Sequence, residues 1–351
     1  MKFRFDEIAF NSTLKKKPVE EDKIHYIGLE HIEPGNFSIT EWGSDVAPVG
    51  EKLIMKKGDI LFGKRRAYQR KVAIAPFDGI FSAHGMVLRP KTDVIDADFF
   101  PLFISSDTFM ETAMRISVGG LSPTINWKDL KEQEFELPSL EEQQTIAKKA
   151  WAAYRLKEAY QRLLSATDEM VKSQFIEWFG DMKYLTSDKT MSDFFDMKAG
   201  QSITAENIIA TYDLELFPCY GGNGLRGYVT HYTHEGHYCL IGRQGALCGN
   251  VNLTDGKFFA TEHAIVVTPK ININTYWLFF ALSEMNLNRF ARGVAQPGLS
   301  VKQLETIPFS IPPTEEQDSF ERLYRQADKS KFELKRAIEA IDKVIKSLIN
   351  G

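Results

Sequence analysis

The feature that most constrains this chain is an internal duplication with a period of roughly 175 residues. Residues 52–90 contain KGDILFGKRRAY followed by FSAHGMVLRP, and residues 237–269 contain YCLIGRQGA followed by FATEHAIVVTP. Four pairs of matching residues are separated by the same 179 positions, namely Gly63 with Gly242, Lys64 with Arg243, His84 with His263, and Pro90 with Pro269. This regular spacing predicts two copies of one folded module.

Two further matches follow in the same order. GGLS at residues 119–122 matches PGLS at residues 297–300, and FELPSLEEQ at residues 135–143 matches FSIPPTEEQ at residues 309–317. The separation has fallen to 174 positions at the last match. Because five blocks in one order are not expected from chance, we interpret the chain as a tandem repeat rather than as two unrelated domains.

A long helix is predicted after each copy. No proline or glycine interrupts residues 141–179 or 315–350, and Gly180 is placed to end the first helix. Each helix has the signature of a capping box at its start, formed by Ser139 with Glu142 in the first helix and by Thr314 with Gln317 in the second.

Apolar residues recur every seven positions along both helices, which predicts a coiled coil. The second helix carries Phe320, Ala327, Leu334, Ile341 and Leu348, and the first carries Leu156, Leu163 and Met170. Antiparallel packing of the two helices within one chain is the simplest arrangement, and it would place the two copies at opposite ends of the pair. A dimer seam between two chains is the alternative.

Each copy is predicted to be an α+β domain with its own core. The segments predicted as buried strands are 59–62, 85–88, 238–241 and 264–267, the predicted helical segments are 99–114 and 276–290, and a turn is predicted at 221–224. We therefore expect two pseudo-symmetric α+β domains separated by two long antiparallel helices in a coiled coil. The expected boundaries are 1–139 and 181–312 for the domains, and 140–180 and 313–351 for the helices.

Composition is that of a chain without a membrane span. The formal charge is −4, and no apolar run approaches the roughly 20 residues needed to cross a bilayer. The N-terminus carries charges inside its apolar stretch, unlike a signal peptide. Cys219, Cys239 and Cys248 lack CxxC spacing, so they are expected to be reduced thiols of a cytoplasmic protein.

Motifs for catalysis are weak or missing. The GxxxxGK string at residues 58–64 is followed by Arg65 instead of the Ser or Thr of a phosphate-binding loop. His231, His234 and His237 are spaced three apart in a turn-rich region, where a solvated loop is a better interpretation than a metal site. We therefore expect no catalytic residues, metal or cofactor in this chain. The rival interpretations are a DNA-modifying enzyme with degenerate motifs and a protein-binding scaffold.

Candidate DNA contacts gather around the matched blocks. Residues 64–71 read KRRAYQRK, with five basic residues and no acidic one. Arginine can pair with guanine, and glutamine or asparagine with adenine, while lysine and arginine also bind phosphates. The candidates in the first copy are Lys64, Arg65, Arg66, Tyr68, Gln69, Arg70, Lys71, His84 and Ser122. Those in the second copy are Asn223, Arg226, Arg243, Gln244, His263, Arg292, Gln296 and Ser300.

The whole chain resembles the specificity subunits of type I restriction–modification systems. The resemblance rests on Leu240–Gly245 (LIGRQG), Ala260–Ala264 (ATEHA), Gln296–Leu299 (QPGL) and the two Pro…Glu-Glu-Gln entries into the long helices. It implies that each copy is a target-recognition domain for one part of a split site in double-stranded DNA. It also implies that the helices are spacers that bind DNA adenine methyltransferase subunits, in a complex with restriction and translocase subunits.

The resemblance further implies that the chemistry belongs to those partners, which would carry S-adenosylmethionine, ATP and Mg²⁺. The chain departs from the family pattern in its short length and in its first copy, where Gly-Lys-Arg-Arg at residues 63–66 replaces Gly-Arg-Gln-Gly at residues 242–245. The short length leaves open a two-component system, in which a comparable subunit serves a fused methyltransferase–nuclease.

Overall fold

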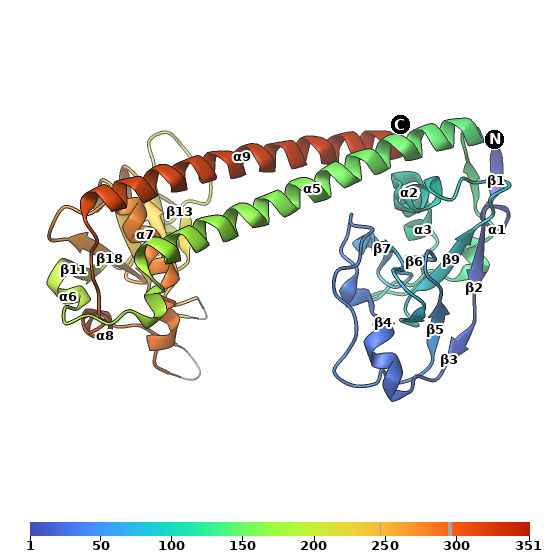
Figure 1. Ribbon diagram of the computed structural model, residues 1–351. Helices are drawn as coiled ribbons and strands as arrows, with labels where there is room; N and C mark the ends of the chain where they lie inside the picture. Colours follow the sequence, from blue (N-terminus) through green and yellow to red (C-terminus); the bar gives the residue numbers. More distant parts are fainter. Residues whose placement is uncertain (246, 294–296) are drawn as a thin grey trace. The chain divides into compact units, whose positions relative to one another are not determined.

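The computed structural model describes residues 1–245, 247–293 and 297–351 (Figure 1). This part of the chain divides into two compact units. Unit 1 comprises Met1–Gln161 and Lys335–Gly351, and unit 2 comprises Arg162–Leu334. Each unit therefore includes a part of both long helices, α5 (Leu140–Phe179) and α9 (Thr314–Asn350).

Helix α5 begins and ends as the sequence predicts. The backbone amide of Ser139 donates to the carboxylate of Glu142 at 2.8 Å, and the backbone amide of Glu142 donates to Ser139 Oγ at 3.3 Å, which completes the capping box. At the other end, Gly180 has a φ of +80° and its amide donates to the carbonyl of Ile176 at 2.8 Å. Glycine accepts this left-handed conformation without strain, so the helix stops there.

The capping box predicted at the start of α9 is wrong. The Gln317 side chain does not return to Thr314, because its Oε1 accepts a hydrogen bond from the backbone amide of Asn274 at 2.8 Å. Its Nε2 donates to the carbonyl of Pro312 at 2.7 Å. Gln143 makes the equivalent bonds in α5, accepting from the amide of Asp96 at 2.8 Å and donating to the carbonyl of Pro138 at 3.0 Å.

Both glutamines are buried, each with 1% of its surface exposed. Their bonds tie the first turn of each long helix to a residue whose side chain accepts from amides at the start of another helix of the same unit. Asp96 accepts from the amides of Asp98 and Phe99 at the start of α2 (Phe99–Ser105), and Asn274 caps α7 (Thr275–Glu284) by accepting from the amides of Tyr276 and Trp277. The duplication is therefore visible in hydrogen bonds as well as in sequence.

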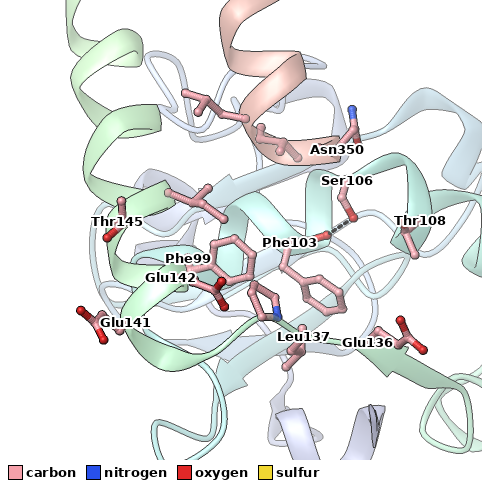
Figure 2. Close-up of a pocket in the computed structure, with 15 residues that line it drawn as sticks. Phe99, Phe103, Ser106, Thr108, Glu136, Leu137, Glu141, Glu142, Thr145 and Asn350 are labelled. Atoms are coloured by element: carbon pink, nitrogen blue, oxygen red, sulfur yellow. Dashed lines mark hydrogen bonds between the residues drawn. The ribbon is translucent and has the colours of Figure 1, made fainter. Parts of the chain in front are cut away.

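The two long helices contact each other within each unit. In unit 1, Lys157 of α5 pairs with Asp342 of α9 at 2.6 Å, and in unit 2, Lys331 of α9 pairs with Asp168 of α5 at 2.8 Å. The two lysines are 174 positions apart, and so are the two aspartates, which is the spacing of the repeat at the start of the long helices. The last turn of α9 is also anchored in unit 1, where Asn350 accepts a hydrogen bond at 2.6 Å from the backbone amide of Asp107, next to Ser106 (Figure 2).

The predicted apolar stripe is found on α9 but is displaced on α5. Phe320 and Ala327 are buried, while Leu334, Ile341 and Leu348 are half-buried. Leu156, Leu163 and Met170 are instead 44%, 51% and 43% exposed, so their predicted packing against the other helix is wrong. The residues of α5 that pack into the units lie on a neighbouring face, and they include Ala147, Ala150, Val171 and Phe175.

Unit 1 contains two four-stranded sheets. The first has the antiparallel order β2 (Ala9–Ser12), β9 (Met86–Pro90), β6 (Ile60–Phe62), β7 (Val72–Ile74). The second has the order β3 (Lys15–Lys16), β5 (Lys52–Met55), β8 (Gly79–Phe81), β4 (Tyr26–Ile27). Strands β1 (Lys2–Arg4) and β10 (Glu134–Glu136) pair separately and precede α1 (Phe5–Ile8) and α5, respectively.

Unit 2 repeats the first sheet strand for strand in its described residues. The order is β11 (Phe195–Ala199), β18 (Ala264–Pro269), β15 (Tyr238–Gly242), β16 (Val251–Thr254). Its second sheet has the order β13 (Gly224–Val229), β12 (Phe217–Gly221), β17 (Lys257–Ala260), β14 (His234–Glu235). The four predicted strands and the turn at residues 221–224 are therefore confirmed.

The second sheets share three strands and differ at one edge. Strands β5, β8 and β4 have the same relative directions as β14, β17 and β12, because one outer pair is antiparallel and the other is parallel in both. Unit 1 adds β3 beside β5, whereas unit 2 adds β13 beside β12. Strand β13, which forms a hairpin with β12, is thus an elaboration of unit 2.

The helical segments predicted after the first sheet are interrupted in both units. Residues 99–114 form α2 and α3 (Asp107–Arg115), which are separated at Ser106 because its extended backbone and its side chain cap α3. Residues 276–290 form most of α7 and a 3₁₀ turn, Leu287–Phe290, separated by Asn286 at a φ of +53°. Short helices α4 (Trp127–Leu130), α6 (Met191–Phe194) and α8 (Val301–Glu305) complete the units.

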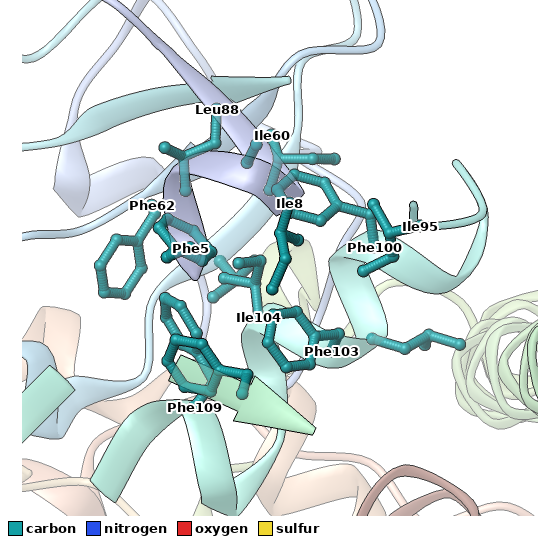
Figure 3. Packing of buried hydrophobic residues seen from close by; sticks show 14 of the residues in the cluster. Phe5, Ile8, Ile60, Phe62, Leu88, Ile95, Phe100, Phe103, Ile104 and Phe109 are labelled. Carbon is teal, nitrogen blue, oxygen red and sulfur yellow. The ribbon is translucent and has the colours of Figure 1, made fainter. Parts of the chain in front are cut away.

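Each unit has its own aromatic core. In unit 1, Phe109 lies 5.3 Å from Phe5, 5.5 Å from Phe62 and 5.6 Å from Phe135, measured between ring centroids (Figure 3). These phenylalanines come from α3, α1, β6 and β10, so the core joins the N-terminus to the sheet and to the strand before α5. In unit 2, Trp277, Phe309 and Phe320 belong to the buried core, and Phe309 is the counterpart of Phe135 at the 174-residue spacing.

No helix in the described residues is both long enough and apolar enough to cross a membrane. Cys219, Cys239 and Cys248 are all buried and free. Burial raises the pKa of the Cys239 thiol well above its ordinary value, so this thiol stays protonated at neutral pH.

Candidate nucleic-acid interface

In unit 1, three segments that are distant in sequence meet at one end of β6. The amide of Arg65 donates to the carbonyl of His84 at 3.2 Å, and the amide of Arg66 donates to the carbonyl of Pro123 at 2.7 Å. The amide of Ile125 in turn donates to the carbonyl of Lys64 at 3.0 Å. The backbone therefore holds the basic segment, the turn at His84 and the loop before α4 together.

The side chains of these segments also meet. Arg65 Nη1 lies 3.5 Å from His84 Nε2, and Arg66 Nε donates to Ser122 Oγ at 3.2 Å. Both arginines keep further N–H groups that these contacts leave unused, because a guanidinium has five donors. The site can therefore present positively charged donors to a phosphate or a base edge.

Two arginines of the basic segment have left-handed backbone conformations. Arg66 has a φ of +57° and Arg70 a φ of +53°, and they flank the 3₁₀ turn Ala67–Gln69. Such conformations are uncommon for residues other than glycine and usually require support from the surrounding structure. The turn they bracket leaves the Tyr68 side chain 54% exposed.

Not every basic residue of the segment is free to bind a ligand. Arg70 Nη2 donates to Asp107 Oδ1 at 2.6 Å and to the carbonyl of Ser105 at 2.9 Å. Lys71 Nζ donates to the carbonyl of Leu29 at 2.6 Å. These two side chains fasten the C-terminal end of the 3₁₀ turn to the rest of unit 1, while Gln69 lies half-buried beside them.

Lys15 and Lys52, which the sequence does not link to this site, add to its positive charge. Burial lowers the pKa of Lys64, and the charge of Lys15 lowers it further. Burial also lowers the pKa of His84, and the charges of Arg65, Lys64 and Lys52 act in the same direction. Lys15 and Lys52 come from β3 and β5, so only the pairing of the second sheet brings them near.

Unit 2 builds a similar arrangement from the second copy of the repeat, except that the amide bonded to the histidine carbonyl belongs to the counterpart of Lys64 and not to that of Arg65. The amide of Arg243 donates to the carbonyl of His263 at 2.9 Å, and the amide of Leu299 donates to the carbonyl of Arg243 at 2.8 Å. Gln244 Oε1 lies 3.0 Å from His263 Nδ1. Glu262 Oε1 lies 3.4 Å from the other nitrogen of the same ring, so this site is less positive than that of unit 1.

One pair of side chains is therefore repeated in both units. Arg65 with His84 in unit 1 corresponds to Gln244 with His263 in unit 2. Gln244 follows Arg65 by 179 positions, and His263 follows His84 by the same number. The scaffold is the same, but one copy presents a guanidinium and the other an amide. These are the side chains that favour guanine and adenine, respectively, in the major groove.

The structure changes the register of one sequence match. Leu299 bonds to the carbonyl of Arg243 in the way that Ile125 bonds to that of Lys64, so PGLS corresponds to residues just after GGLS. Leu121 is 98% exposed, whereas Leu299 and Ile125 are 2% and 0% exposed. The match of GGLS to PGLS is therefore wrong, because the identical residues do not occupy equivalent positions in the hydrogen-bonded structure.

The same register explains why Ser122 and Ser300, both predicted to contact DNA, have different bonding partners. Ser300 caps α8, with its Oγ donating to Gln303 Oε1 at 2.7 Å, while Ser122 accepts from Arg66. Gln296 lies outside the described residues. Ser300 is thus occupied in a capping box, and Ser122 belongs to the site of unit 1.

The remaining candidates of unit 2 are exposed. Asn223 lies in the turn of the β12–β13 hairpin, where its Oδ1 accepts from Asn250 Nδ2 at 3.2 Å, and Asn250 follows the Arg243 segment. Arg226 lies on β13, and Arg292 bridges to Gly298 through its backbone. Asn250 was not predicted as a contact. The turn signal at residues 221–224 located its partner Asn223, but no signal in the sequence located Asn250 itself.

The histidines at positions 231, 234 and 237 are not gathered around a metal site. His234 stacks on Phe258 at 5.3 Å, and His237 lies 3.3 Å from Asp255. Among the described residues, no group of three or more histidine, cysteine, aspartate or glutamate side chains has the geometry to hold a metal ion.

Comparison with known proteins gives a consistent picture. A family model described as the type I restriction modification DNA specificity domain matches residues 3–156 and 185–341. The EcoprrI specificity subunit of Escherichia coli, a type I restriction enzyme subunit, is 49% identical over 130 residues, which cover 37% of this chain and 32% of that protein. The putative specificity subunit S.HindORF215P of Haemophilus influenzae is 36% identical over 99 residues, covering 27% and 26%.

The chain thus spans about a third or less of the length of these curated relatives. Its fold resembles that of the S subunit of a type I restriction–modification system from M. genitalium. That similarity has a TM-score of 0.62 at 17% identity and covers 99% of this chain and 94% of the other. The likeness concerns the fold of the two proteins.

Proposed function

Because this chain belongs to the family of type I restriction–modification DNA specificity domains, we propose that it reads a bipartite site in double-stranded DNA for a larger complex. Residues 1–139 and 181–312 each bind one half-site. Residues 140–180 and 313–351 form an antiparallel coiled coil that sets the unread gap. The chain itself is non-catalytic, and it acts in the cytoplasm.

The repeated side-chain pair carries this proposal. Arg65 beside His84 and Gln244 beside His263 occupy equivalent places in two modules of the same fold. A repeated scaffold with different donors at one position is suited to reading two different half-sites. The positive charge of Lys64 and Arg66 supplies the phosphate contacts that position such a protein on DNA.

The spacer role is supported by the contacts between the long helices. The ion pairs Lys157–Asp342 and Lys331–Asp168 use equivalent residues of α5 and α9, with the roles of the two helices exchanged. This is the symmetry expected of two helices that run in opposite directions. A fixed pairing register would fix the distance between the two half-sites.

The partners are proposed to be DNA adenine methyltransferase subunits and restriction or translocase subunits. Leu156, Leu163 and Met170 leave an exposed apolar line at seven-residue spacing on α5, which suits packing against a helix of a methyltransferase subunit. S-adenosylmethionine, ATP and Mg²⁺ would be bound by those partners, where methylation, translocation and cleavage take place.

A selection experiment tests the proposal. The full chain, alone and with its methyltransferase partner, would be incubated with random duplex DNA, and the retained sequences would be determined. We expect two short specified segments separated by a gap of constant length. Arg65→Ala should relax one segment and Gln244→Ala the other, because the two side chains belong to different units.

Three results would contradict the proposal. A single uninterrupted site would show that the two units do not read separate segments. Relaxation of the same segment by both variants would show that the matched pairs do not act independently. Salt-insensitive retention of protein partners without DNA would favour a scaffold, because binding to phosphates weakens steeply with salt.

A further inference from the structure

Each unit has one tight turn directly after the segment that holds its copy of the repeated side-chain pair. In unit 1 the turn is bracketed by Arg66 and Arg70, whose φ values are +57° and +53°. In unit 2 it is bracketed by Gly245 and Gly249, which both have a φ of +86°. The corresponding residues are again 179 positions apart, so both units place the same left-handed conformations at the two ends of the turn.

The hydrogen bonds of the turn are repeated as well. The amide of Gly63 donates to the carbonyl of Lys71 at 2.9 Å, and that of Gly242 donates to the carbonyl of Asn250 at 2.8 Å. Inside each turn, the first left-handed residue accepts a hydrogen bond from the amide three positions later, at 2.9 Å in unit 1 and 3.0 Å in unit 2. The turn is therefore a fixed part of the repeated module.

One side chain of this turn is large, apolar and exposed in both units. Tyr68 is 54% exposed and Leu247 is 52% exposed, and these two residues are also 179 positions apart. The next side chain is directed inward in each unit, because Gln69 is half-buried and Cys248 is 3% exposed. Packing inside the units thus accounts for the neighbours of Tyr68 and Leu247 but not for these two side chains.

Tyr68 and Leu247 lie close in sequence to the side chains that are proposed to read bases, since they follow Arg65 and Gln244 by three positions. Three residues of chain span at most about 10 Å, which corresponds to about three base-pair steps of DNA. In the major groove, base edges offer hydrogen-bonding groups and one kind of apolar group, the methyl group of thymine. An apolar side chain carried beside a base-reading residue therefore has a single apolar target on the base edges.

We propose that Tyr68 and Leu247 are specificity-determining residues, each of which contacts the methyl group of a thymine in the half-site of its own unit. The inference rests on the proposed function, because it requires Arg65 and Gln244 to face the major groove. The ring of Tyr68 and the aliphatic side chain of Leu247 both offer apolar surface, and removal of a methyl group from water against such a surface is favourable. Each specified segment should therefore contain a thymine.

Deoxyuridine tests these contacts, because it differs from thymidine only in lacking the methyl group. The duplex obtained by selection would be labelled, and each thymine of the two segments would be replaced in turn by deoxyuridine. Binding to the full chain with its methyltransferase partner would be followed by fluorescence anisotropy. We expect at least one replacement in each segment to weaken binding by about fourfold, the effect of losing one methyl group from an apolar contact.

Variants of the full chain assign each methyl contact to one residue. Leu247→Ala should bind the thymine and deoxyuridine duplexes equally in the segment that Gln244→Ala relaxes, and should keep the original response in the other segment. Tyr68→Ala should show the converse. Tyr68→Phe keeps the ring and should keep the response. Because each alanine variant retains the response in one segment, that response also reports that the variant is folded.

Ile271→Ala is the matched control for Leu247→Ala. Ile271 is 51% exposed, and it follows β18, whereas His263 precedes that strand. It therefore lies beyond the end of β18 that is remote from the candidate site. This variant should respond to deoxyuridine in both segments as the original chain does, and loss of the response would show that the effect is not specific to Leu247.

The outcomes separate this inference from the proposed function. Failure to select a bipartite site would refute the proposed function itself. A bipartite site with segments that lack thymine, or one that binds equally well with deoxyuridine, would leave the proposed function in place and refute the methyl contacts. If Leu247→Ala weakened binding of both duplexes and kept the difference between them, its contact would be with another part of the DNA, and the inference would be overturned.

Discussion

The side chain of buried Gln143 accepts a hydrogen bond from the backbone amide of Asp96 at 2.8 Å, and Gln317 makes the same bond to Asn274 in the second unit. Each bond joins the first turn of a long helix to the capping residue of a domain helix. The contact depends on the oxygen and the NH₂ group of the uncharged glutamine amide, which bond to backbone groups. This makes the two positions suitable for a stability test.

Gln143→Leu should destabilise unit 1. The change leaves the amide of Asp96 and the carbonyls of Val94 and Pro138 without their partner, and each buried group left unsatisfied costs about 1–3 kcal/mol. We expect the free energy of unfolding of unit 1, measured with urea, to fall by about 3 kcal/mol or more, because three groups lose their partner. Gln144→Leu, a change at the exposed neighbouring position, is the control. A loss of equal size in both variants would refute the role of the buried amide.

Arg66→Ala and Gln244→Ala should differ in their effect on the salt dependence of DNA binding. Removal of a cation that contacts phosphate lowers the slope of log K against log salt by about 1, whereas removal of a neutral amide does not. Arg66 is exposed and uses only its Nε within the unit, so we expect a smaller slope for Arg66→Ala and an unchanged slope for Gln244→Ala. Titrations at several salt concentrations measure both. Equal slopes for the two variants and the original chain would show that Arg66 makes no phosphate contact.

The stability of unit 1 should decrease as the pH falls through the range in which His84 titrates. Burial and the neighbouring cations hold the pKa of His84 below 6.5, so the folded state binds fewer protons than the unfolded state below about pH 6.5. The contribution of neutral His84 to the stability of unit 1 is therefore complete above that pH and is lost at lower pH. His84→Gln should make the fall between about pH 7 and pH 5 shallower, as measured by chemical denaturation. An identical dependence of stability on pH in the original chain and in His84→Gln would show that His84 does not cause the fall.

Exchange of the charges in the Lys157–Asp342 pair should separate attraction from side-chain size. Asp342→Lys alone places two cations together and should destabilise unit 1 by roughly 1 kcal/mol, within the range of partly exposed pairs. The double variant Lys157→Asp with Asp342→Lys should recover most of that loss. Urea denaturation of the single and double variants measures the coupling. A double variant no more stable than the single one would mean that the pair contributes little.

Gly242→Ala should disturb the interface of unit 2. A Cβ atom at this position would lie 2.1 Å from the carbonyl oxygen of Gly222, in the turn of the β12–β13 hairpin. Relief of that clash requires a backbone shift, with a cost of about 1–3 kcal/mol. Gly298→Ala, where the nearest atom would be 3.6 Å away, is the control. Thermal unfolding and DNA binding should both be weakened in the first variant, and a normal result for both would rule out the close approach.

Two strands of the first sheet in each unit could be predicted from sequence because they coincide with the matched blocks. β6 ends just before Gly63 and β15 ends at Gly242, while β9 and β18 run up to Pro90 and Pro269. Proline stops a strand and glycine permits a close turn, so both boundaries are local properties. The pairing of β3 with β5 depends on contacts between separate segments and left no comparable signal.

The errors on the long helices have a different origin. The sequence of α5 contains two adjacent apolar stripes, and periodicity alone does not distinguish the one that packs from the one that stays exposed. Gln317 likewise stands at the right spacing for a capping box, yet its side chain has a better partner in Asn274. A local motif predicts what a side chain can do, while tertiary contacts determine which of its options it takes.

The candidate site was only partly accessible to sequence analysis. The cluster at residues 64–71 was evident, but Arg70 and Lys71 turn inward to Asp107 and Leu29. Lys15 and Lys52 reach the site of unit 1 from another sheet. Charge density along the chain therefore located the segment, and the fold decided which of its charges face outward.

The division of the chain into units also bears on its synthesis. Unit 2 is continuous in sequence, whereas unit 1 joins Met1–Gln161 to Lys335–Gly351. The bond between Asp107 and Asn350 spans 243 positions, so unit 1 cannot be completed until its final helical turns have left the ribosome. The module translated first is consequently the last to close, and until then its helix α5 emerges without the partner that α9 later provides.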